Sequence, residues 1–197
     1  MLLRMIPLLL FFLVAGPAAA QTVLFDGLVH EDRQAAAVLI PAVVTGDDYS
    51  VLARLEYGVA DRANLFALLG GRFNGGATAL PGVGWAATFY RQTDAFPLNF
   101  GLFNSFVFPI EDGGPDALVT VAPVFSHSWG RGTGGRVTPY AGATATIKVN
   151  KPGRGGNTDV NGLLGVKVTE IAKRWDFVAE VQPGEKSLFA VGFVFRF

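Results

Sequence analysis

Apolar residues stand at every second position along most of this chain, in segments of about ten residues. The clearest segment is 138–149. One face carries Pro139, Ala141, Ala143, Ala145, Ile147 and Val149, and the other carries Thr138, Tyr140, Gly142, Thr144, Thr146 and Lys148. A strand places alternate side chains on opposite faces, whereas an amphipathic helix needs apolar residues three and four positions apart. The alternation therefore predicts strands.

Gly, Asp, Asn and Pro separate the alternating segments, as turn residues separate strands. Ten strands are expected, near 34–44, 48–59, 64–74, 82–92, 97–109, 117–129, 137–149, 158–170, 175–182 and 186–197. Pro41 interrupts the first range, and proline belongs at an edge or a bulge of a sheet. An arrangement of eight strands, with the first pair treated differently, is the alternative.

The choice of outward face decides the class of protein. Charged residues make up 16% of the chain, against about 25% in soluble domains. A soluble, lipocalin-like barrel would crowd Phe, Leu and Val into its interior, although an eight-stranded interior is only just wide enough for side chains or one small ligand. With the faces reversed, small and polar residues line the lumen and bulky apolar residues face lipid. Lipid cannot satisfy an open sheet edge. The expected fold is all-β: a closed, antiparallel, up-and-down transmembrane β-barrel of ten strands.

The first twenty residues resemble a targeting segment instead of a part of the fold. Arg4 precedes an apolar stretch at 5–14, and Ala18, Ala19 and Ala20 form the small-residue pattern of a cleavage site. The apolar stretch is about half as long as the roughly 20 residues that span a bilayer. We therefore expect a cleaved signal peptide at 1–20, a periplasmic segment at 21–33 and the barrel at 34–197. The segment at 21–33 is a tail, a cap or a lumen plug.

Two motifs carry a family resemblance. The chain ends on a strand that alternates Phe189, Val191, Phe193, Phe195 and Phe197, which resembles the C-terminal assembly signal of Gram-negative outer-membrane β-barrel proteins. Glu56-Tyr57-Gly58, followed by Asp61-Arg62, resembles a periplasmic hairpin common in such barrels. The resemblance implies an outer-membrane location and recognition of Phe193, Phe195 and Phe197 by the barrel assembly machinery, after delivery by periplasmic chaperones. It also places the Asp61-Arg62 and Lys173-Arg174 turns in the periplasm and the Gly- and Pro-rich loops outside.

Charged residues on the inward face form the candidate functional set. The alternation places five cations and two carboxylates there: Arg54, Glu56, Arg72, Lys148, Lys167, Glu180 and Arg196. Buried charges need partners, which favours an ion-pair network that fills a narrow lumen. An excess of cations would alternatively favour the passage of small anions.

Other chemistry has little support in the sequence. The chain has no Cys, and its two histidines, His30 and His127, are far apart, so we expect no metal and no cofactor. It has no Gly-x-Ser-x-Gly motif and no basic excess for nucleic acid. We expect a monomer in outer-membrane lipid, without enzymatic activity, in a structural or surface-interaction role. The alternatives are a narrow channel for small solutes or anions and a lipid-modifying enzyme, which would need a Ser–His pair on neighbouring strands.

Overall fold

The computed structural model describes residues 35–45, 48–73, 76–111, 115–130, 135–150, 157–184 and 187–197. The predicted signal peptide at 1–20 and the predicted segment at 21–33 lie outside these ranges, as do parts of the loops. No helix within the described ranges is long and apolar enough to cross a membrane.

Eleven strands make up the described structure: β1 (Ala35–Thr45), β2 (Asp48–Ala60), β3 (Ala63–Phe73), β4 (Ala77–Ala79), β5 (Gly82–Tyr90), β6 (Asn99–Val107), β7 (Ala117–Ser126), β8 (Val137–Val149), β9 (Thr158–Ala172), β10 (Trp175–Gln182) and β11 (Leu188–Arg196). Ten of them match the predicted ranges to within a few residues. The remaining strand, β4, was not predicted. It contains three residues, which is too few for a period-two pattern to be recognised.

Three predicted ranges extend too far. β5 ends at Tyr90, β6 covers only Asn99–Val107, and β7 ends at Ser126. Between β5 and β6 the backbone turns, because the Thr93 amide donates to the Phe96 carbonyl and the Phe96 amide donates to the Thr93 hydroxyl. Pro97 has no amide hydrogen to extend β6.

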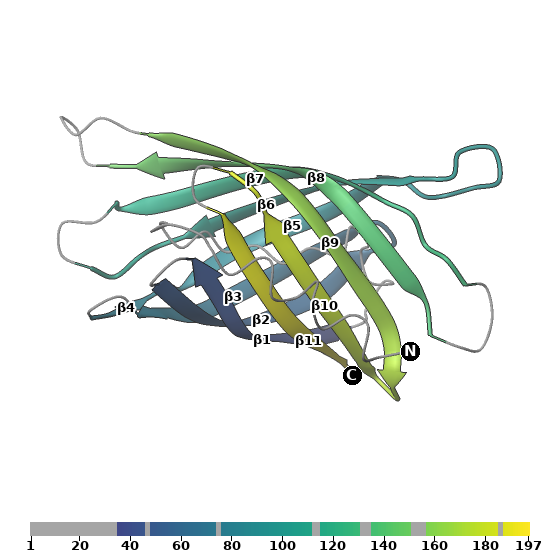
Figure 1. Ribbon diagram of the computed structural model, residues 1–197, viewed down its shortest axis with the longest axis horizontal. Helices are drawn as coiled ribbons and strands as arrows, with labels where there is room; N and C mark the ends of the chain where they lie inside the picture. Colours follow the sequence, from purple (N-terminus) through teal and green to yellow (C-terminus); the bar gives the residue numbers. More distant parts are fainter. Residues whose placement is uncertain are drawn as a thin grey trace.

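The sheet is antiparallel and follows an up-and-down order. Neighbours in the chain pair with one another, with β3 pairing to both β4 and β5. β1 also pairs with β11, from Ala36 opposite Arg196 to Val44 opposite Phe189. Each of the ten long strands therefore has an antiparallel neighbour on either side. Figure 1 shows these strands curving around a common interior.

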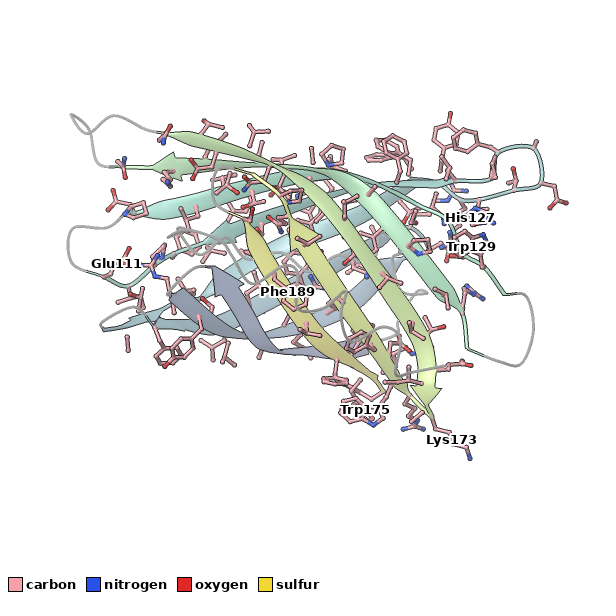
Figure 2. The ribbon with its side chains drawn as sticks, viewed as in Figure 1. Glu111, His127, Trp129, Lys173, Trp175 and Phe189 are labelled. Carbon is pink, nitrogen blue, oxygen red and sulfur yellow. The ribbon has the colours of Figure 1, made fainter. Side chains whose placement is uncertain are left out.

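Tight and long connections join the strands at both ends of the sheet. At one end the β2–β3 turn is tight, and the β9–β10 turn contains Arg174 with a positive φ of 66°. The C-terminus lies at this end, where the Arg196 amide donates to the Arg174 carbonyl (Figure 1). Figure 2 shows Lys173 and Trp175 here and Glu111 at the opposite end. β4 lies at the Glu111 end, and long connections occur at both ends: β6–β7 and β8–β9 at the Glu111 end, β5–β6 and β7–β8 at the C-terminal end.

Candidate functional site: the inward face of the sheet

Burial alternates residue by residue along the strands, so the sheet has an inward and an outward face. On β6, Asn99, Gly101, Phe103, Ser105 and Val107 are buried, whereas the residues between them are partly or fully exposed. On β11, Val194 is 2% exposed and Phe193 is 38% exposed. Phe100, Leu102, Phe193 and Phe195 lie on the outward face, and Asn99, Gly101, Tyr140 and Thr144 lie on the inward face, as the alternation predicts.

An ion pair next to an aromatic stack occupies the inward face of β2 and β3. Arg54 and Glu56 are both buried, and Arg54 Nε lies 2.5 Å from Glu56 Oε1. The Arg54 guanidinium carbon lies 5.3 Å from the centre of the Phe66 ring, a cation–π geometry. Phe66 in turn stacks on Phe103 of β6, with ring centres 4.8 Å apart. Apolar and charged side chains therefore share this part of the interior.

A buried hydrogen-bonded group crosses the inward face from β8 to β10. The Tyr140 hydroxyl donates to Glu180 Oε2 at 2.9 Å, and Gln182 Nε2 donates to Glu180 Oε1 at 2.8 Å. Tyr140 pairs with Gly165 of β9, and Gly165 pairs with Glu180 of β10. A Cβ at position 165 would overlap the Tyr140 ring. Only glycine at this position lets the tyrosine lie across β9 and reach the carboxylate.

We expect Gly165→Ala to destabilise the protein by about 1–3 kcal/mol, because the added methyl group overpacks the space that holds the Tyr140 ring. Gly76→Ala is the control, since a Cβ at position 76 would meet nothing within 4 Å. Urea unfolding in detergent measures both variants. Equal stability of the two would contradict the close packing of Tyr140 against Gly165.

A second cluster joins β9, β10 and β11 around Asp176, which is 1% exposed. Arg196 Nη2 lies 3.0 Å from Asp176 Oδ1, and Lys167 Nζ lies 3.7 Å from Asp176 Oδ2. The backbone amide of Glu170, which has a positive φ of 58°, donates to Asp176 Oδ1 at 2.9 Å. One carboxylate therefore faces two cations and fixes an irregular turn of β9 beside the C-terminal strand.

Two further ion pairs lie at the opposite end of the inward face. Arg72 of β3 pairs with Glu111, which also accepts a hydrogen bond from Thr78 Oγ1 at 3.0 Å. Lys148 of β8 pairs with Asp159 of β9 at 2.8 Å. All four ion-pairing side chains are partly exposed.

Among the described residues the inward charge is balanced, which corrects the predicted excess of cations. Arg54, Arg72, Lys148, Lys167 and Arg196 each have a carboxylate within ion-pair distance. Sequence reasoning missed three of these carboxylates: Glu111, Asp159 and Asp176. Asp176 could have been predicted from the sequence, because it shares the alternation of Glu180 on the same strand. Without a cation excess, the argument for an anion-selective lumen loses its basis.

The aromatic residues of the proposed assembly signal pack along the outward face of the last two strands. Phe193 contacts Phe177 with ring centres 5.7 Å apart, and Phe195 contacts Trp175 at 4.9 Å. Phe197 stacks on Phe195 at 6.0 Å and is 60% exposed. The Glu56-Tyr57-Gly58 motif lies at the end of β2, directly before the β2–β3 turn.

His127 lies at the same end of the sheet as Trp175 (Figure 2). Its ring packs against Trp129 with centres 5.2 Å apart, and its Nδ1 donates to the Pro97 carbonyl. The two rings form an aromatic pair at this end of the sheet. No group of three or more potential metal ligands occurs within the described ranges.

No protein-family model and no curated protein matches the chain. Among solved structures, a designed transmembrane β-barrel is 9% identical, with a TM-score of 0.45 over 86% of this chain and all of that one. The N-terminal β-barrel domain of Pseudomonas aeruginosa OprF is 12% identical, with a TM-score of 0.40 over 85% of this chain and all of that one. A bacterial polysaccharide outer-membrane secretin is 15% identical, with a TM-score of 0.42 over 79% of this chain and 57% of that one. The class of the fold, an all-β antiparallel up-and-down sheet, follows from this chain's own strand pairings.

Proposed function

We propose that this chain is an outer-membrane β-barrel protein of a Gram-negative bacterium, with ten strands in a closed transmembrane barrel. The pairing of β1 with both β2 and β11 supports closure. Only a closed barrel satisfies every strand edge in hydrocarbon, where no water replaces a missing hydrogen bond. The short β4 then belongs to an outer loop and not to the wall.

The distribution of side chains between the two faces carries the proposal. The buried charges lie on the inward face, whereas the outward positions of β2–β11 are mainly apolar. Exposed aromatic residues lie toward both ends of the strands, with Trp129, Trp175 and Phe197 at one end and Tyr49, stacked on the partly exposed Phe73, at the other. Transmembrane barrels have this arrangement, in which an apolar band is flanked by aromatic girdles.

Export and assembly follow from the resemblance. A signal peptide at 1–20 takes the chain across the inner membrane, periplasmic chaperones carry it, and the assembly machinery recognises the strand that ends at Phe197. With an even strand number both ends of the barrel wall lie in the periplasm. The β6–β7 connection, which contains Glu111, then faces the outside of the cell, as do the other connections at the same end.

We further propose a structural or surface-interaction role without catalysis, in which paired charges fill the lumen. The packed and balanced inward face supports this role more than a channel, because every cation of the set is held by a carboxylate. In planar bilayers we expect no discrete conductance steps.

Glu56→Ala separates a filled lumen from a conducting one. Removing the carboxylate leaves Arg54 buried without this partner, and we expect a loss of about 1–3 kcal/mol in the free energy of unfolding. The Phe66 ring retains part of the interaction with the guanidinium. Asp116→Ala is the control, because it removes a carboxylate from an exposed position. Unchanged melting of Glu56→Ala, together with changed ion selectivity in planar bilayers, would overturn the filled-lumen proposal in favour of a channel.

A further inference from the structure

One polar side chain interrupts the apolar outward face far from the ends of the strands. Asn104 is the sixth of nine residues in β6 and lies between the buried residues Phe103 and Ser105, so its side chain is on the outward face. The other outward polar side chains of described β2–β11 are Tyr49, Tyr57, Tyr90, Thr158 and Glu170, and these lie toward the strand ends. In the proposed barrel, Asn104 therefore lies near the middle of the hydrocarbon layer.

The amide of Asn104 is not satisfied within the described part of its chain. Its Oδ1 atom is covered and has no hydrogen-bond partner among the described residues. The residue pairs with Trp85 of β5 and Val121 of β7, and Leu102 and Phe106 flank it along β6. Hydrocarbon offers no donor or acceptor, so an unpaired amide at this depth is unfavourable. The side chain as a whole is partly exposed.

An apolar groove lies beside Asn104 on the same side of the sheet. It has a volume of about 500 Å³, and Trp85 and Phe106 line it together with Leu55, Leu65 and Val83. These five groove residues lie on the outward face. Ala67, which pairs with Leu55 and Val83, has a small side chain and also lines the groove. The outward face from β2 to β6 therefore combines an apolar groove with the polar side chain of Asn104, and we call this surface the strip.

We propose that this strip is a contact surface for a second copy of the same chain, an inference that rests on the proposed membrane location. A carboxamide both donates and accepts, so it is complementary to itself. A twofold axis along the membrane normal brings the same residue of two copies together at the same depth. In the proposed dimer each Asn104 side chain rotates so that its covered Oδ1 reaches the surface, and Asn104 of one copy pairs with Asn104 of the other. Outward apolar side chains of each copy then enter the groove of the other. This replaces the monomer expected from the sequence.

Disulfide cross-linking in intact outer membranes tests the contact, because the chain contains no cysteine of its own. Leu102→Cys places a single thiol on the proposed surface and keeps Asn104. Leu164→Cys places one on the outward face of β9, which does not border the strip. We expect mild oxidation to give a dimer of twice the chain mass for Leu102→Cys and none for Leu164→Cys.

A second substitution in the Leu102→Cys background tests the amide itself. We expect Asn104→Leu to raise the dissociation constant in detergent roughly tenfold, the size of one or two lost hydrogen bonds in a membrane. Asn104→Gln, which keeps the amide, retains most of the dimer. An Asn104→Leu dimer as strong as that of Leu102→Cys alone would overturn the role of Asn104.

Heat-modifiable gel mobility separates failure of this inference from failure of the barrel. A Leu102→Cys protein that shows the mobility shift of a folded barrel but stays monomeric, or cross-links only to a protein of another mass, overturns the dimer. Absence of both the shift and the outer-membrane location for the unsubstituted chain overturns the proposed function instead.

Discussion

Asp176→Asn should destabilise the protein by about 3–5 kcal/mol, the usual cost of breaking a buried pair and leaving its partner charge behind. Asparagine keeps the shape of the side chain but removes the charge that faces Lys167 and Arg196. Lys167 is 4% exposed, so water cannot compensate for the loss. Urea unfolding in detergent, followed by tryptophan fluorescence, measures the change.

Asp116→Asn is the matched control, because it removes the same charge from an exposed position. Its effect should stay within about 0.5 kcal/mol, as for most surface substitutions. The Asp176 cluster would be ruled out as a main contributor to stability if both variants unfolded at the same urea concentration.

Phe193→Arg should cost about 2–4 kcal/mol, the penalty for arginine on the lipid face near the middle of a membrane. Phe193 is outward on β11 and contacts only Phe177 among aromatic rings of the described residues. Phe193→Leu keeps an apolar surface toward lipid and should cost less. The free energy of unfolding in lipid vesicles gives both values. A Phe193→Arg variant as stable as Phe193→Leu would show that this face does not meet hydrocarbon.

The strands and their two faces could be predicted from the sequence because both follow from local alternation. Thr138–Val149 shows this well: one rule gave the strand and the inward direction of Tyr140, Thr144 and Lys148. The ends of strands were harder to predict. Between β5 and β6, a turn around Thr93 and the missing amide hydrogen of Pro97 stop the pairing of the two strands.

Contacts between strands could not be predicted, because they depend on register. Tyr140 and Glu180 lie forty positions apart, and only the pairing of Gly165 with both shows that they meet. Glu111 lies beyond the end of β6, so alternation assigned it no face, and its pairing with Arg72 depends on the fold of the connection. The predicted excess of inward cations was wrong partly for this reason, since Glu111 had no assigned face, and partly because Asp176, which shares the alternation of Glu180, was overlooked.

A nitroxide scan along β8 distinguishes a membrane barrel from a soluble one. Single cysteines replace each residue from Ala141 to Ile147 in an otherwise cysteine-free chain, and the labelled proteins are reconstituted in vesicles. Collisions with oxygen should be frequent at 141, 143, 145 and 147, where a nickel complex dissolved in water should be excluded. Positions 142, 144 and 146 should show low oxygen accessibility. High accessibility of the odd positions to the nickel complex, or oxygen collisions without a period of two, would contradict a lipid-facing outer surface.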